Sequence, residues 1–127
     1  MIKIFPNSMS VNLDTVEEKL ISELRLSPTQ AKVFVFVIKN GKMSIEEIAK
    51  KIGISNPLAF ETAKQLVELG GFIEMNKTEF QSMHPRFAVV NMYRRMCQRE
   101  NIQFKKNLLV DNIAIVLEKL YDDVRTK

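Results

Sequence analysis

Apolar residues recur at intervals of three and four positions over most of the chain, a spacing that predicts a mainly helical protein. The first such pattern starts near Asn12 and places five apolar residues on one helical face: Leu13, Val16, Leu20, Ile21 and Leu24. Residues 1–11 show no comparable pattern, and we expect them to form an N-terminal arm.

The segment LSPTQAKVFVFVIKNG carries signals for both ends of a helix. Ser27 and Gln30 have the spacing of a capping box, Pro28 suits a first helical turn, and Gly41 suits a helix end. The β-branched and aromatic run VFVFVI is also compatible with a buried strand. The capping signals favour a helix that is buried on most sides.

Two shorter helices are predicted next, separated by a tight turn. Ser44 and Glu47 form a second capping box, and Gly53 ends the first of the two helices. Asn56 or Ser55 then caps the second helix, which has Pro57 in its first turn. Two short helices joined by a glycine-containing turn of three or four residues are typical of a helix-turn-helix.

A β-hairpin is predicted directly after this pair, because the apolar residues of FIEM and EFQSM flank the polar NKT. A hairpin in this position is the wing of a winged helix-turn-helix. Pro85 disfavours a helical conformation at His84, so we place the end of this domain there and assign it residues 12–85.

Residues 86–124 contain neither glycine nor proline and again show helical spacing. Five apolar residues step by four, three, four and four positions, close to a coiled-coil seam: Leu109, Ile113, Val116, Leu120 and Val124. Polar residues interrupt the pattern upstream, so one long helix and two helices broken near Glu100-Asn101 both remain open. We expect residues 86–127 to be a coiled-coil-like dimerisation segment.

Composition narrows the classes of function. The chain has 127 residues, a formal net charge of +4, one cysteine and one histidine. A single Cys97 and a single His84 exclude an intramolecular disulfide framework and leave few ligands for zinc or partners for a nucleophile. No apolar run approaches the roughly 20 residues of a membrane span. We therefore expect a cytoplasmic protein without contact to membranes that is not an enzyme and uses no metal or cofactor.

The segments LSPTQAKVFVFVIKNGKMSIEEIAKKIGIS and AFETAKQLVELGGFIE resemble the winged helix-turn-helix domain of the archaeal TrmB-like transcriptional regulators. The resemblance covers roughly residues 24–76, and the positions that carry it are Leu26, Ala31, Lys32, Val33, Phe34, Gly41, Ile48, Ala49, Gly53, Ile54, Phe60, Leu66 and Gly70. It implies a homodimer that binds double-stranded DNA, with the second helix of the motif in the major groove. Larger members carry a sugar-binding domain, which we do not expect here.

In this arrangement the recognition helix reads base edges and nearby groups hold phosphates. Asn56 and Gln65 suit adenine, and Glu61 suits the amino group of cytosine. The full set of expected DNA contacts adds Thr62 and Lys64 on the same helix, with Ser44, Lys77 and Arg86 on phosphates.

The distribution of charge argues against this expectation. Residues 44–83, which include the expected reading head, hold four lysines and six glutamates, whereas residues 84–127 carry a net charge of +4. Arg94, Arg95 and Arg99 form the densest basic cluster, which suits either a solvated helix face or contact with nucleic acid or an acidic partner. The alternative function is therefore a winged helix that binds a protein of the archaeal transcription or chromosome machinery. That function would use Leu58, Phe60 and the helix that carries the basic cluster, although Phe60 also matches a family position that packs against the wing.

Overall fold

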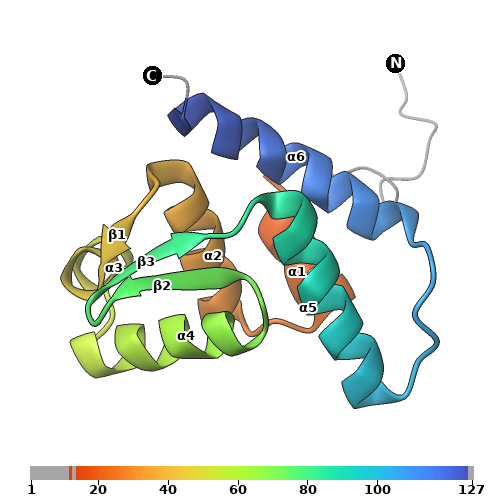
Figure 1. Ribbon diagram of the computed structural model, residues 1–127, viewed down its shortest axis with the longest axis horizontal. Helices are drawn as coiled ribbons and strands as arrows, with labels where there is room; N and C mark the ends of the chain where they lie inside the picture. The colour runs from red at the N-terminus through yellow and green to blue at the C-terminus, as the bar shows by residue number, and fades with distance from the viewer. Residues whose placement is uncertain (1–11, 13, 126–127) are drawn as a thin grey trace.

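The computed structural model describes residue 12 and residues 14–125 (Figure 1). The expected arm of residues 1–11 and the helical position Leu13 lie outside the described residues. The described part is mainly helical, with a small antiparallel sheet of three strands. Its elements are α1 (Val16–Leu24), α2 (Pro28–Asn40), β1 (Met43–Ser44), α3 (Ile45–Ile52), α4 (Asn56–Glu68), β2 (Phe72–Asn76), β3 (Glu79–Ser82), α5 (Pro85–Glu100) and α6 (Leu108–Arg125).

Both predicted capping boxes are present. The Ser27 hydroxyl accepts from the backbone N–H of Gln30 at 3.0 Å, and the Gln30 side chain accepts from the N–H of Ser27 at 2.9 Å. Ser44 and Glu47 repeat this reciprocal pair at 3.1 and 2.9 Å. The run VFVFVI is helical, as the capping signals predicted, and five of its six side chains are buried. A cap satisfies helix-end N–H groups that have no partner within the helix, which outweighs the strand preference of these residues.

The predicted hairpin is present and contains β2 and β3, in which Phe72 pairs with Ser82 and Ile73 with Gln81. A third strand, β1, was not predicted. It comprises only Met43 and Ser44 and pairs with the inner strand β3, which gives the sheet order β1-β3-β2. The strand β2 is therefore an edge of the sheet, and its residues after Phe72 are exposed.

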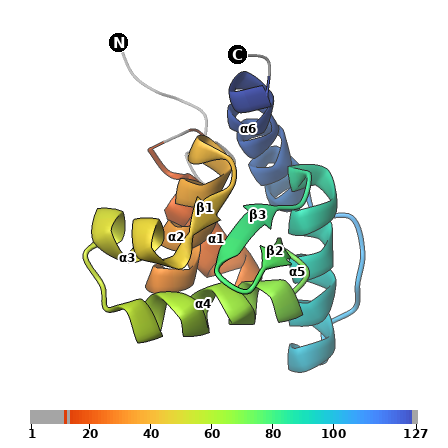
Figure 2. The ribbon, with the colours of Figure 1, turned by 60° about the vertical axis from the view of Figure 1, so that its left-hand side comes forward.

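One hydrophobic cluster extends through all six described helices and the sheet. The ring of Phe34 on α2 lies 6.0 Å from the ring of Phe72, which in turn lies 6.4 Å from that of Phe80. Buried residues of α5 and α6 belong to the same cluster, so residues 86–125 share the core of the preceding segment. In Figure 2, α4 runs along the bottom, the sheet lies above it in the middle, and α5 and α6 lie on the right.

The C-terminal segment forms two helices and not one long helix, which settles the choice that the sequence left open. Helix α5 ends at Glu100, Asn101 follows with φ 58°, and α6 begins at Leu108. Asparagine tolerates this left-handed conformation better than most residues, and here it reverses the chain so that α6 packs against α5.

The expected dimer seam requires a correction at Ile113. Its side chain is 0% exposed and lies in the core with Val110, Ala114 and Leu117. The other four seam residues, Leu109, Val116, Leu120 and Val124, are half-buried within the chain. The reason is that α6 contacts α1, α2 and α5, and these contacts occupy the apolar face that the spacing assigned to a partner.

Candidate functional site

The helices α3 and α4 are joined by Gly53, Ile54 and Ser55. Gly53 ends α3 in the left-handed conformation, with φ 82°, and its N–H donates to the carbonyl of Ala49. The Ser55 hydroxyl accepts from the N–H of Leu58 at 3.2 Å, so Ser55 and not Asn56 caps α4. The Asn56 side chain is thereby left exposed at the start of this helix.

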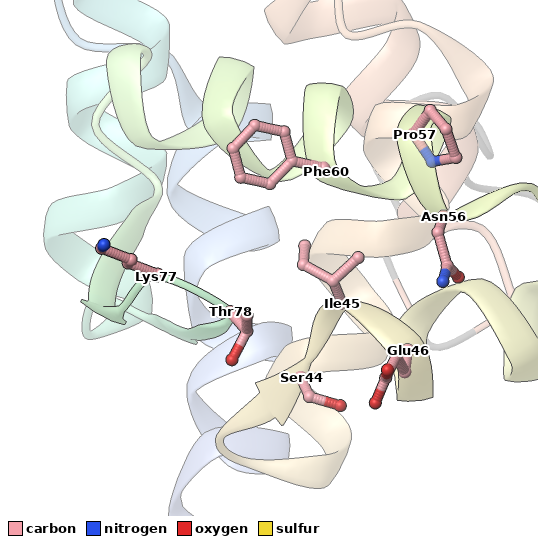
Figure 3. A pocket seen from close by; sticks show the side chains of 8 residues that line it. All are labelled: Ser44, Ile45, Glu46, Asn56, Pro57, Phe60, Lys77 and Thr78. Carbon is pink, nitrogen blue, oxygen red and sulfur yellow. The ribbon is translucent and has the colours of Figure 1, made fainter.

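A hollow lies between the N-terminal ends of α3 and α4 and the tip of the β2–β3 hairpin (Figure 3). It is lined by Ser44, Ile45, Glu46, Asn56, Pro57, Phe60, Lys77 and Thr78. The N–H of Ile45 donates to the carbonyl of Thr78 at 2.8 Å, which fixes the hairpin tip against α3. The structure thus brings together three of the expected DNA contacts, namely Ser44, Asn56 and Lys77.

Two residues of α4 that were expected to contact DNA are buried or already hydrogen-bonded within the chain. Thr62 is only 2% exposed, which corrects its assignment as a base contact. Gln65 is half-buried, and its side-chain oxygen accepts from the amide of Gln30 on α2 at 2.8 Å. Because α2, α3 and β2 all contact α4, the buried side of this helix is wider than its apolar residues alone indicate.

The exposed side of α4 carries acidic and apolar groups. Glu61 and Glu68 are exposed, and the one lysine of this helix, Lys64, forms an ion pair with Glu74 on β2. The Nζ atom of Lys64 also lies 5.9 Å from the ring centroid of Phe60. Lys77 at the hairpin tip is exposed and has no ion pair with any described residue.

Two apolar side chains of α4 are partly open to solvent, Leu58 at 40% and Phe60 at 43% exposure. The exposure of Phe60 differs from the expectation that it packs against the hairpin. Ile73 and Met75 on the edge strand β2 are exposed as well. Sequence reasoning did not select the hollow's Glu46, Pro57 and Thr78, because their place depends on the approach of the hairpin tip to α3.

Arg86 is not part of this site. Its Nε atom donates to Glu118 on α6 at 3.0 Å, beside a groove between α5 and α6. Glu118 also lies 3.4 Å from Nε2 of His84, whose Nδ1 accepts from the N–H of Arg86. His84 therefore caps α5 and links it to α6, and Arg86 serves the same contact between helices.

The other residues that could take part in chemistry, Cys97 and Tyr93, lie in the packed interior of the chain. Cys97 is buried, and within the described part of the chain no group of three His, Cys, Asp or Glu side chains could hold a metal ion. Burial raises the pKa of Tyr93, whose hydroxyl donates to the carbonyl of Lys105 at 3.1 Å. None of the helices among the described residues has the length and apolar character needed to cross a membrane.

Comparison of the chain with models of protein families, with curated proteins and with solved structures found no match.

Proposed function

We propose that residues 28–82 form a winged helix-turn-helix and that the chain is a regulator of transcription that binds double-stranded DNA. The order α2, β1, α3, α4, β2, β3 and the three-residue turn between α3 and α4 support this proposal. The observation that carries it is the hollow in which Ser44, Asn56 and Lys77 meet at the ends of three elements. The likeness to the archaeal TrmB-like regulators supports the same function, with a cytoplasmic location.

In this proposal each contact has its own role. Asn56 is exposed in the first turn of α4 and can form two hydrogen bonds with adenine, while Glu61 can accept from cytosine. Lys77 holds a phosphate, because its ammonium group is exposed and unpaired among the described residues. Ser44 can donate its hydroxyl hydrogen to a second phosphate, because within α3 that oxygen acts as an acceptor.

The regulator acts as a homodimer in this proposal, and the surface of contact differs from the expected seam. The apolar residues that α6 leaves most exposed are Leu108 and Ile115, with Phe87 exposed on the neighbouring helix α5. A symmetric dimer through this surface would bury these exposed side chains against their copies.

Selection from a library of random duplexes at physiological salt tests the proposal. We expect an enriched sequence that the purified chain binds at least a thousandfold more tightly than unrelated duplex. Asn56→Ala should change the enriched bases at one position of each half-site, and Lys77→Ala should weaken binding to all sequences alike. Lys119→Ala on α6 is the matched control for Lys77→Ala. A folded chain that enriches no sequence would contradict the proposal.

A second function is supported by the exposed Leu58 and Phe60 beside an acidic surface. In this alternative, α4 binds a protein of the transcription or chromosome machinery that presents apolar and basic groups. The variant Leu58→Ser separates the two functions, because it removes an exposed apolar side chain without adding a charge, and Leu58 does not line the hollow that contains Asn56 and Lys77. Loss of a protein partner with unchanged DNA binding would support the alternative.

A further inference from the structure

The basic cluster at the end of α5 lies next to α4. The guanidinium of Arg95 donates a hydrogen bond through Nη1 to the carbonyl of Glu68, the last residue of α4. Arg99 follows four positions later on the same helix and therefore lies on the same face. Both side chains are exposed, and neither forms an ion pair with a described carboxylate. One cation is thus available at the C-terminal end of α4, and a second lies one helical turn further along α5.

Glu100 follows Arg99 directly in the sequence but does not neutralise the charge of Arg95 and Arg99. Glu100 is paired with Arg25 at the end of α1, at 3.1 Å between Nε and Oε2. Glu68 contributes its backbone carbonyl to Arg95, and its carboxylate is the exposed acidic group of the last turn of α4. The surroundings of Arg95 and Arg99 therefore keep a positive excess, in contrast to α4 itself.

Helix α4 has 13 residues and is therefore about 20 Å long. Lys77 lies near its N-terminal end across the hollow, and Arg95 lies at its C-terminal end. The major groove of B-DNA is about 12 Å wide and is bordered by one phosphate strand on each side. A helix of this length, with cations at both ends, can reach both strands when it lies across the groove.

We infer that Arg95 and Arg99 bind the phosphate backbone of the duplex that α4 faces, on the strand opposite the one held by Lys77. The inference rests on the proposed DNA binding and assigns to α5 the phosphate contacts that α4 lacks. In Figures 1 and 2, α4 and the last turns of α5 both lie along the lower side of the molecule, whereas α6 lies toward the top. A duplex on the lower side meets both elements and leaves α6 free.

The double variant Arg95→Gln/Arg99→Gln tests this inference by its salt dependence. Each phosphate contact contributes a slope of about 0.9 to the plot of log K against log salt, so the slope should fall by about 1.8. At about 0.1 M salt the affinity should fall tenfold or more, equally for specific and unrelated duplexes. Arg95→Lys/Arg99→Lys should restore most of the slope, because it keeps both charges.

The matched control is Lys39→Gln/Lys119→Gln, which removes two exposed cations from the side of α6. Arg99→Gln alone should lower the slope by about 0.9 without removing the bond between Arg95 and α4. Unfolding curves verify that each variant is folded. A slope equal to that of the control would overturn the inference while DNA binding stands. A wild-type chain that binds no duplex would overturn the proposed function as well.

Discussion

Lys64 and Glu74 form an ion pair between α4 and β2, with 2.9 Å between Nζ and Oε1. Both side chains are partly exposed, and such pairs contribute about 0–1 kcal/mol to stability. The larger effect is on the electrostatic potential at the exposed side of α4. This potential becomes more negative, because the one lysine of this helix is neutralised within the chain. The expected DNA contact at Lys64 is therefore weakened, because its ammonium group is already paired within the chain.

Glu74→Gln should strengthen DNA binding by releasing the charge of Lys64. The salt slope should become steeper by about 0.9, which corresponds to one more phosphate contact. Glu118→Gln is the matched control, since Glu118 is also a glutamate paired with a cation but lies between α5 and α6. Titration by fluorescence anisotropy at several salt concentrations measures both variants. Equal slopes for the two would show that Lys64 does not reach DNA even when unpaired.

The boundaries of α2 and α3 were predicted well because their signals are local. Ser27 with Gln30 and Ser44 with Glu47 form the capping boxes that their spacing indicates. Two of the assignments that were wrong, Thr62 and Ile113, depend on how many elements pack against a helix. Both α4 and α6 contact three other elements, so residues beyond the main apolar stripe are buried. Nor does spacing reveal the pair of Lys64 and Glu74, because it depends on how β2 packs against α4.

Gly70 and Gly53 offer a comparison between two left-handed glycines. Their φ angles are 88° and 82°, so alanine costs about 1–2 kcal/mol of backbone strain at either position. A Cβ at Gly70 would lie 2.7 Å from the Cβ of Asn91, whereas at Gly53 nothing lies within 4 Å. We expect Gly70→Ala to cost about 1–3 kcal/mol more than Gly53→Ala, because the turn between α4 and β2 must move away from α5. Chemical unfolding measures the difference, and equal costs would contradict the close approach.

Ile113 lies in the core of the chain, whereas Ile115 lies on the proposed dimer surface. Substitutions at these two positions therefore distinguish folding from dimerisation. Ile113→Asp should destabilise the fold by several kcal/mol, because it places a carboxylate in the core without a partner. Leu108→Asp/Ile115→Asp should leave the unfolding temperature of the monomer nearly unchanged, since both side chains are more than half exposed. We expect this double variant to be monomeric by light scattering. A dimer that survives both changes would place the interface on another surface.

Tyr93 joins α5 to the loop before α6, both through its hydroxyl and through its ring, which lies 5.5 Å from that of Phe104. Tyr93→Phe should lower the free energy of unfolding by about 1 kcal/mol at neutral pH, because it removes one hydrogen bond. Burial raises the pKa of Tyr93 above its ordinary value of 10.0, so the protonated hydroxyl is favoured in the folded chain. This contribution is present below pH 10 and is lost as the pH rises through the folded-state pKa.

The stability advantage of the wild type over Tyr93→Phe should therefore shrink in alkaline solution. The chain has two tyrosines and no tryptophan, so Tyr121→Phe leaves Tyr93 as the one phenol whose ionisation the absorbance reports. We expect the midpoint of that titration to lie above 10 in the folded variant and to fall to the ordinary value in denaturant. A folded-state midpoint at or below the denatured value would contradict burial as the cause, as would a stability difference that does not change with pH.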